Sequence, residues 1–527
     1  MKKLIVYTCI IAALLTLTAC GSLLDRFVPD IDPPDEEQEY TTPHPSEHTQ
    51  YTIAHVPDDG ILRLPMRHPL TLNPLLNEDA SVAKILSLIF EPLVVFDENL
   101  QPADHLAHLE LSSDFTRATL AIRHDAIWSD GMPVTSDDLI FSVEVLQVAP
   151  EAAIYKRNID NIYRIDRIDS RTVVIHFNYA SMTAAYGLNF PIIPEHYYRG
   201  HNNFGSSRNM APLGNGTFII EDLSPMLSMT LVGNPYTFRR AVIDRVDVLF
   251  IPDAESMLHA FDQGIVDAIR MPFSEWVKHR SVKTAVPADF PAMYFEFIGF
   301  NFNGGLFCDV RARQGVAYAF DIDEAVSDVY SHQAIRAVSP IHPSSWMHDD
   351  EVHGPAYDIA RAMSLLRTVD TYEPLTVLVN EEHIERVIIA ERLLAGLVRA
   401  GMEAELIVLP FEEYYARLME GEFDLFLGGM QLDFAPEFGF MFEPSELFGY
   451  APEMAVYLAN LGYASTETAF LQAVSQLQQG FNQHLPVISL GFRHSAVLTG
   501  TRVQQLHAPA TDHNFVFANE WIIATQP

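Results

Sequence analysis

Cysteine is scarce in this chain, which has three among its 527 residues: Cys9, Cys20 and Cys308. The first two belong to an N-terminal segment discussed below, so Cys308 stands alone in the body of the protein. One cysteine cannot form an intramolecular disulfide, and a disulfide framework is therefore excluded. A free cysteine usually behaves as a small apolar residue, and we expect Cys308 to be packed in the interior.

Positive charge is also in short supply. The chain has 33 lysines and arginines against 69 aspartates and glutamates, which gives a formal net charge of −36. A surface of this sign repels phosphate backbones and anionic lipid head groups. Nothing in the sequence resembles the basic stripe that nucleic-acid binding requires. The charge balance argues against nucleic acid as a partner and indicates a well-solvated surface.

The motifs of common catalytic sites are missing. The sequence has no His-Glu-x-x-His, Gly-x-Ser-x-Gly or Cys-x-x-Cys, and no glycine-rich phosphate loop. We therefore predict a protein that is not an enzyme and uses no cofactor. The histidines are scattered, and we interpret His383 and Glu385 as part of the solvated face of a helix. No metal site is predicted, although spacing alone does not test for one built from distant histidines.

Only one long apolar run is present. Leu4–Leu17 follows Lys2 and Lys3 and leads to Leu-Thr-Ala-Cys, which ends at Cys20. The run is short for a membrane span and has the charged start of an export signal. Its ending resembles the lipobox of bacterial lipoproteins. That resemblance implies that residues 1–19 are removed and that a lipid on Cys20 anchors the protein outside the cytoplasm, on the outer face of the cell membrane or facing the periplasm. An ordinary signal peptide is the alternative.

Residues 20–50 are rich in proline and acidic residues, and no lysine or arginine lies between Arg26 and Arg63. The segment lacks apolar periodicity, so it cannot bury enough surface to offset the entropy lost on ordering. Proline and like charge stiffen such a chain. We predict a semi-extended tether between the lipidated Cys20 and the folded body, with an acidic recognition tail as the alternative.

Beyond residue 51 the pattern alternates between strand and helix. Arg117–Arg123 and Thr172–Phe177 are rich in β-branched residues and predict strands. Thr135–Gln147 predicts a helix with a threonine or serine cap and an acidic first turn. His383–Gly401 predicts a second helix that ends at glycine and is followed by strand, helix and strand. This order predicts an α/β fold with a largely parallel sheet, and the length predicts more than one domain.

Seven collinear stretches resemble those of one family. Ala126–Val143 (AIWSDGMPVTSDDLIFSV) is very similar to the signature of family 5 extracytoplasmic solute-binding proteins, the oligopeptide-, dipeptide- and nickel-binding components of ABC importers. Several motifs in order are much more specific than one, and they cover nearly everything from Thr71 to about Arg493. The other stretches are Thr71–Leu76, Ile89–Ala107, Ser112–Asp125, Ala260–Ile269, Ile298–Val326 and Gly421–Glu437.

The resemblance implies a two-lobe, type II periplasmic-binding-protein-like fold, with hinge-connected lobes and an extra inserted domain. Two segments are expected to cross between the lobes, Met293–Asn303 and Pro486–Phe492. The implied division is 51–84, 199–290 and 486–527 for domain I, 85–198 for domain II, and 291–485 for domain III.

Some conspicuous motif residues are predicted to be structural. We expect Trp128 to be packed in the core and Asp130–Gly131 to form a tight turn. Asn215–Phe218 is interpreted as a turn that precedes a strand.

Asp433 is the residue that the resemblance singles out for ligand binding. In peptide-binding members, an aspartate at this place pairs with the α-ammonium group of the ligand. The apolar stretch Phe423–Gly429 predicts a buried strand, so Asp433 follows a strand end, where α/β proteins place binding loops. The family usually has tryptophan in place of Met430, which leaves the ligand class open. The neighbours predicted to contribute are Met430, Gln431 and Phe434.

We predict the substrate-binding lipoprotein of an ABC importer, a monomer that delivers short peptides to permease and ATPase subunits. One alternative is that the same fold binds a chelated metal such as nickel or haem, or another small solute. The other is a surface receptor or adhesion protein that works without a transporter. Peptide binding predicts a roomy polar cleft with charged ends, whereas a receptor role predicts a filled cleft and an exposed apolar patch.

Overall fold

The computed structural model describes residues 60–271, 285–435, 441, 452–504 and 521–523, apart from short gaps at 202–203, 304, 331–332 and 369–372. The signal segment, Cys20 and the predicted tether lie outside the described residues. None of the helices in the described ranges is both long and apolar enough to cross a membrane.

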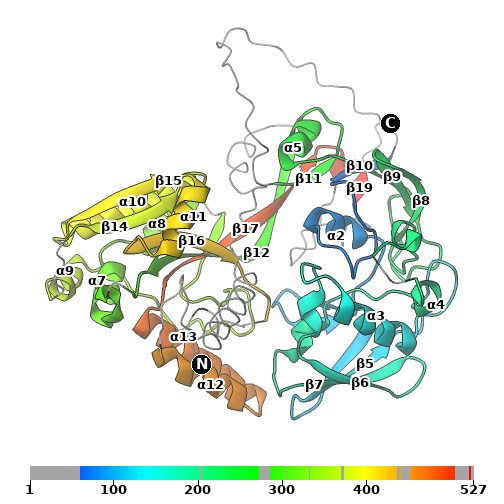
Figure 1. The fold of residues 1–527 in the computed structure, drawn as a ribbon, viewed down its shortest axis with the longest axis horizontal. Coiled ribbons are helices and arrows are strands. Elements are labelled where there is room, and N and C mark those ends of the chain that lie inside the picture. The colour runs from blue at the N-terminus through cyan, green and yellow to red at the C-terminus, as the bar shows by residue number, and fades with distance from the viewer. Residues whose placement is uncertain are drawn as a thin grey trace, which may run out of the picture.

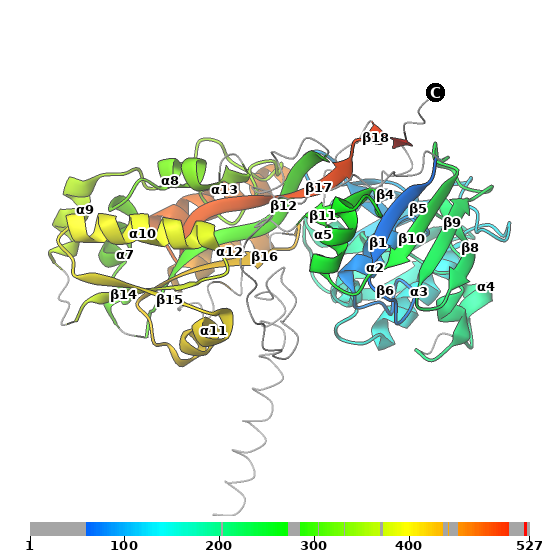
Figure 2. The same cartoon turned by 90° about the horizontal axis from the view of Figure 1, so that it is seen from above.

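Two lobes are joined by a pair of long antiparallel strands, as Figure 1 and Figure 2 show. Strand β12 (Ala285–Phe300) runs from the first lobe into the second, and β17 (Ile488–Gly500) returns beside it. Strand β17 also pairs with β11 (Ala268–Met271), and β12 pairs with β16 (Leu425–Gln431). One hydrogen-bonded sheet therefore continues from lobe to lobe, and the two predicted crossing segments overlap β12 and β17.

Within the described ranges, the first lobe contains two four-stranded sheets, a short hairpin and four helices. Its strands are β1 (Leu62–Met66), β2 (Val94–Phe96), β3 (Pro102–Asp104), β4 (Ala107–Leu111), β5 (Arg117–Ile122), β6 (Ile162–Arg167), β7 (Thr172–Phe177), β8 (Phe218–Ser224), β9 (Ser228–Gly233) and β10 (Arg245–Phe250). Its helices are α2 (Ala80–Leu86), α3 (Ser136–Val148), α4 (Glu195–Tyr198) and α5 (Ala254–Asp262). The sheet orders are β1-β10-β9-β8 and β4-β5-β7-β6, and β2 pairs with β3. In these sheets only β1 and β10 run parallel.

The second lobe is built on a seven-stranded sheet that includes the joining strands. Its further elements are α7 (Val310–Tyr318), α8 (Ile322–Tyr330), β13 (Ala334–Arg336), α9 (Ile359–Leu366), β14 (Leu375–Asn380), α10 (Ile384–Arg399), β15 (Ala404–Leu409), α11 (Phe411–Glu420), α12 (Ala455–Tyr463) and α13 (Glu467–His484). The sheet order is β11-β17-β12-β16-β14-β15, with β13 paired to β17. A small further pair, β18 (Val503–Gln504) and β19 (Ile522–Ile523), lies near the end of the chain.

The predicted parallel sheet is confirmed only in part. Strand β14 is parallel to β15 and β16, where helices α10 and α11 connect the strands. The pairs that involve β12 and β17 are antiparallel instead. The physical reason is that these two strands cross between the lobes in opposite directions.

The predicted helix boundaries are confirmed where capping residues mark them. Thr135 is the N-cap of α3, and its backbone N–H donates to the Asp138 carboxylate at 2.8 Å. Helix α10 ends at Arg399 and is followed by Gly401, whose φ of +91° is a left-handed conformation that glycine adopts without strain.

The prediction that Cys308 is packed in the interior is wrong. Its side chain is exposed, and the thiol donates to the carbonyl oxygen of Phe302 at 3.2 Å. Cys308 ends the single helical turn Leu306–Cys308 that precedes α7, and the preceding Phe307 takes the buried position in that turn.

The prediction that His383 and Glu385 lie on the solvated face of a helix is also wrong, because both side chains are only 6% exposed. The first turn of α10 lies over the sheet, beside the buried Arg386 and its partner Glu296 on β12. The first turn therefore buries Glu385 and Arg386 while the apolar Ile384 is 58% exposed, which is the reverse of the amphipathic pattern that the sequence suggested.

Three predicted structural motifs are confirmed. Trp128 is fully buried and its Nε1 donates to Asp138 at 3.1 Å. Gly131 has a φ of +87° and donates its backbone N–H to the Trp128 carbonyl at 2.9 Å, which closes a tight turn. A bend at residues 216–217 leads directly into β8, after Asn215.

The hydrophobic core of the first lobe brings together distant parts of the sequence. It contains Leu62 near the start of the described chain together with Val497 and Trp521 near its end. Trp521 is only 1% exposed. One core cluster of the second lobe takes in Leu100 and Tyr186 from the first. The boundaries proposed for domains I, II and III stay a prediction.

Candidate functional site

Strand β16 leads the chain to Asp433 at the junction of the two lobes. Residues 425–430 of this strand are buried, and Gln431 is its last residue. The next residue, Leu432, donates its backbone N–H to the Met293 carbonyl of β12 at 2.8 Å. Asp433 itself is exposed. The apolar run thus forms a strand as predicted, and Asp433 follows its end beside a joining strand.

A small cavity lies against Asp433. Its volume is about 10 Å³, which is room for about one water-sized group. Both lobes line it, because Leu100 comes from the first lobe while most of the wall belongs to the second. Its walls include Leu100, Met293, Ile341, His342, Asp433 and Phe434.

The lobes are in contact beside this cavity. Trp346 of the second lobe donates its Nε1–H to the Tyr186 hydroxyl at 2.9 Å. The backbone N–H of Trp346 donates to the carbonyl oxygen of Asn99, in the first lobe, at 3.0 Å. The rings of Phe96 and Phe434 also meet across the junction, with centroids 4.4 Å apart. At this place the structure therefore has closed lobes rather than the roomy cleft that peptide binding predicts.

The tip of the β2–β3 hairpin reaches into the second lobe with a strained backbone. Leu100 has a φ of +59°, which a residue with a Cβ rarely adopts. The Asp97 carboxylate holds the turn by accepting from the N–H groups of Asn99 at 2.9 Å and Gln101 at 2.8 Å. Leu100 is only 4% exposed. Backbone strain of this kind costs roughly 1–3 kcal/mol and persists where surrounding contacts enforce it.

The predicted neighbours of Asp433 lie in different surroundings. Met430 is fully buried in the core, with Phe295 of β12 opposite it, and does not line the cavity. Gln431 is exposed, and its Nε2 donates to the carbonyl oxygen of Leu432 at 3.3 Å. Phe434 is half-buried and lines the cavity together with Asp433. Successive strand side chains point to opposite faces, which separates Met430 from Gln431.

A buried charge cluster lies behind the site, where the joining strands meet. We call it the Glu296 cluster, and it consists of Tyr294, Glu296, Asn380, Arg386 and Arg493. Arg386 forms a bidentate ion pair with Glu296, at 2.8 Å from Nε and 3.1 Å from Nη2. Arg493 Nε lies 3.0 Å from the same carboxylate, and its guanidinium lies 3.8 Å from the centre of the Tyr294 ring. The cluster therefore ties β12, β17 and α10 together.

Electrostatic interactions keep Arg386 charged despite its burial. Burial acts to lower the pKa of Arg386, but the Glu296 carboxylate and Tyr294 outweigh it, so the pKa of Arg386 is raised. Burial and the positive charges of Arg386 and Arg493 hold the pKa of His383 far below its usual value. At physiological pH His383 is therefore neutral and Arg386 is charged.

Sequence reasoning missed the Glu296 cluster, although one signal was present in the glycine pair before Met430. A Cβ built on Gly429 would lie 2.4 Å from Arg386 Nη2, 2.6 Å from Tyr294 Cε1 and 3.0 Å from Glu296 Cδ. Only glycine leaves room for these side chains. A glycine inside a buried strand indicates the close approach of another group, but not which group approaches.

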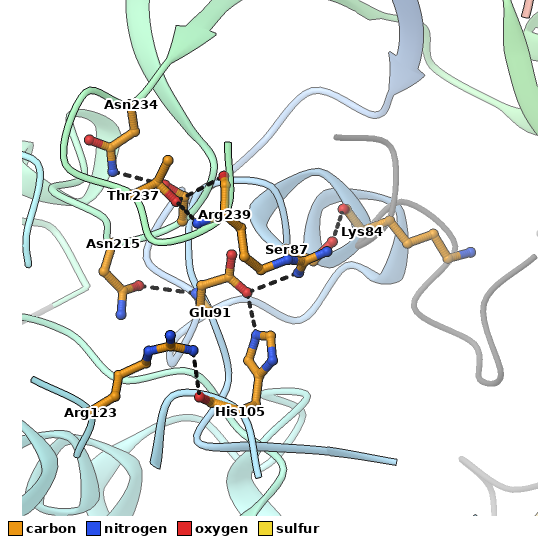
Figure 3. Close-up of polar contacts among 10 residues, drawn as sticks. Lys84, Ser87, Glu91, His105, Arg123, Asn215, Asn234, Thr237 and Arg239 are labelled. Atoms are coloured by element: carbon orange, nitrogen blue, oxygen red, sulfur yellow. Dashed lines mark hydrogen bonds and ion pairs between the residues drawn. The ribbon is translucent and has the colours of Figure 1, made fainter. Parts of the chain in front are cut away.

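A second buried polar cluster lies in the first lobe (Figure 3). Glu91 is 1% exposed, and its Oε2 lies 2.5 Å from His105 Nε2 and 3.4 Å from Arg239 Nη1. Its backbone N–H donates to the Asn215 side chain at 3.0 Å. Arg123 joins the group by donating to the His105 carbonyl oxygen at 3.4 Å. These contacts give Asn215 and Glu91 a structural role within the motifs that suggested the family.

Residues 100–445 match the family described as bacterial extracellular solute-binding proteins, family 5. The match covers about two thirds of the chain. The chain belongs to this family. Family 5 proteins are extracytoplasmic proteins that bind substrates rather than convert them.

Individual relatives of this family 5 protein are distant. Heme-binding protein A of Haemophilus influenzae is 23% identical over 273 residues, which cover 49% of this chain and 50% of that protein. The chain thus spans about half the length of that relative. Among solved structures, the substrate binding protein CtaP of Listeria monocytogenes has a TM-score of 0.76 at 18% identity, covering 88% of this chain and 99% of CtaP. The oligopeptide-binding protein AppA of Bacillus subtilis, solved with a nonapeptide, has a TM-score of 0.63 at 18% identity, covering 88% and 98%.

These structural likenesses confirm the predicted fold of the family 5 protein, the two-lobe type II periplasmic-binding-protein fold. Within the described ranges, no group of three or more histidine, cysteine, aspartate or glutamate side chains is arranged to hold a metal ion.

Proposed function

We propose that this protein is the substrate-binding component of an ABC importer and that it captures short peptides between its lobes. The observation that carries the proposal is the position of Asp433, on a cavity that both lobes line. Asp433 is exposed in this structure, so a bound ligand has to cover it. An ammonium group covered in this way needs a charged partner, and one carboxylate fixes its position. A ligand held in this way contacts both lobes and favours closure.

The remaining roles follow from this proposal. The protein acts as a monomer without catalysis and passes its ligand to permease and ATPase subunits. AppA of Bacillus subtilis, which shares the fold, was solved with a nonapeptide. Campylobacter jejuni NikZ, with a TM-score of 0.67, was solved with nickel and histidine. A chelated metal or haem is therefore the alternative ligand that an experiment has to distinguish from peptide.

The ligand is tested directly by native mass spectrometry of the protein purified from its host. We expect short peptides to co-purify, because closed lobes release a ligand slowly. After the ligand is stripped by partial unfolding and refolding, small-angle scattering should give a larger radius of gyration, and returning the peptides should restore the smaller one. A bound metal chelate or haem would support the alternative instead. An unchanged radius of gyration despite proven binding would argue for a rigid site.

Attachment to the membrane is proposed to depend on Cys20, which ends the Leu-Thr-Ala-Cys sequence. A single acyl group anchors weakly, whereas the diacylglyceryl group on such a cysteine supplies two chains. Cys20→Ala should therefore move the protein from the detergent phase to the aqueous phase, or leave it unprocessed. Cys9→Ala, in the part of the signal that is removed, is the matched control and should leave partitioning unchanged. Normal detergent partitioning of Cys20→Ala would contradict the proposal.

A further inference from the structure

The tip of the β2–β3 hairpin is shaped by bonds within the first lobe. The Asp97 carboxylate accepts from the backbone N–H groups of Asn99 and Gln101. The Asp97 carbonyl oxygen accepts from the N–H of Leu100 at 3.0 Å, and the Asp97 N–H donates to the Gln101 carbonyl oxygen at 2.9 Å. These bonds are local, so the tip does not depend on the second lobe for its shape.

Leu100 at this tip is buried by the other lobe. It is 4% exposed and belongs to the hydrophobic cluster of the second lobe that includes Met293, Ile341 and Met347. Tyr186 of the first lobe packs in the same cluster and is 5% exposed. Both side chains lose this packing when the lobes separate, so their burial favours closure.

Polar contacts act at the same place through Trp346. Its indole N–H donates to the Tyr186 hydroxyl at 2.9 Å, and its backbone N–H donates to the Asn99 carbonyl oxygen at 3.0 Å. The indole is stacked on Phe470 of α13, with ring centroids 5.8 Å apart, which holds it within the second lobe. All of these groups belong to the protein, so the contacts depend on the distance between the lobes and not on the chemistry of a ligand.

We propose that the hairpin tip and Tyr186 form a latch that seats in the second lobe and stabilises the closed lobes by contacts that no ligand mediates. The latch consists of Asn99, Leu100 and Tyr186 of the first lobe, and Trp346 receives it in the second. This goes beyond the proposed function, in which a ligand favours closure only through its own contacts. Because a ligand between the lobes needs them closed, a fixed contribution to closure raises the affinity for every ligand by the same factor.

The direct test is Leu100→Gly in the purified protein, stripped of ligand by partial unfolding and refolding. Glycine adopts the left-handed backbone without strain, so the tip keeps its shape but loses the side chain that seats in the second lobe. Small-angle scattering should show a measurable closed fraction in the stripped parent. The ratio of closed to open molecules should fall roughly 10- to 100-fold in the variant. Equal scattering profiles of the two stripped proteins would overturn the latch.

The matched control is Met226→Gly, at another hairpin tip of the first lobe. Met226 lies between β8 and β9, has a φ of +68° and is 70% exposed. Its replacement relieves the same kind of backbone strain and should leave the ratio of closed to open molecules unchanged. If Met226→Gly opens the lobes as much as Leu100→Gly does, backbone flexibility explains the effect and the proposal fails.

The bond to Trp346 is tested separately with Tyr186→Phe, which removes the acceptor of the indole N–H and keeps the ring. The ratio of closed to open molecules should fall roughly 2- to 10-fold. Tyr163→Phe is the control, because Tyr163 is a 72% exposed residue of β6, and it should change nothing. An unchanged ratio in Tyr186→Phe would overturn the assignment of this bond to the latch.

A binding measurement separates the latch from a contact with the ligand. Calorimetry with Ala-Ala-Ala-Ala and with Lys-Tyr-Glu-Ala should show that Leu100→Gly weakens both by the same factor, no larger than the fall in the ratio of closed to open molecules. Factors that differ by more than about threefold would show that Leu100 contacts the ligand, and would overturn the proposal. If neither peptide binds the parent, the proposed function fails, whereas scattering from the stripped proteins still decides the latch.

Discussion

Glu296→Ala is expected to lower the free energy of unfolding by about 3–5 kcal/mol, because removing one partner of a buried ion pair leaves the other charge uncompensated. Here two cations lose their shared partner. Arg386 is 5% exposed and Arg493 is 4% exposed, so neither is open to water in the folded state. The loss should appear in urea denaturation followed by circular dichroism.

Controls separate this effect from a general sensitivity to lost carboxylates. Glu405 is an exposed residue of β15 in the same sheet, and Glu405→Gln should change stability by no more than about 0.5 kcal/mol. Combining Glu296→Gln with Arg386→Met should cost less than the sum of the single changes, by about 0.5–3 kcal/mol. Additive effects, or an alanine variant as stable as the parent, would show that the ion pair contributes nothing to stability.

Asp433→Ala is expected to weaken the binding of Ala-Ala-Ala-Ala by roughly 30-fold to several thousandfold. Asp433 is exposed in this structure, and the range applies to a ligand that covers it. Truncating one side of a buried, hydrogen-bonded charge pair costs about 2–5 kcal/mol, at about 1.4 kcal/mol per tenfold. The fold should survive, because Asp433 is an exposed loop residue. Calorimetry measures the affinity, and the melting temperature checks the fold.

The matched control is Glu351→Ala, which removes an exposed carboxylate elsewhere in the second lobe and should bind the peptide like the parent. N-acetylation of the peptide should weaken binding to the parent but cause little further loss in Asp433→Ala, since both changes remove the same ion pair. If Asp433→Ala binds the free-amine peptide as tightly as the parent, the ligand is not held there by its N-terminus.

The parts of this molecule that the sequence predicted are those where local chemistry decides the outcome. Thr135 caps a helix and Gly401 follows one because of backbone requirements that a few neighbouring residues reveal. The resemblance to family motifs predicted the two-lobe fold. The apolar run before Met430 was enough to predict a strand that ends just before Asp433.

The parts that were missed depend on contacts between distant segments. His342 and Asp433 are far apart in sequence, and nothing local to either predicts that both line one cavity. Glu296, Arg386 and Arg493 look like ordinary surface charges until the fold buries them together. His383 was misplaced for the same reason, because its burial depends on a strand nearly ninety residues earlier in the chain.

The core of the first lobe also sets when this protein can finish folding. Trp521 and Val497 pack in the same buried cluster as Leu62, so this core needs residues from both ends of the described chain. Ribosomes add roughly 5–20 residues per second, so Trp521 is made roughly 20–90 seconds after Leu62. Until then the first lobe lacks part of its core, and loop-closure entropy opposes contacts over such distances. A chain that has to leave the cytoplasm thus remains incompletely folded for most of its synthesis, which is the condition in which an export channel that threads unfolded polypeptide can accept it.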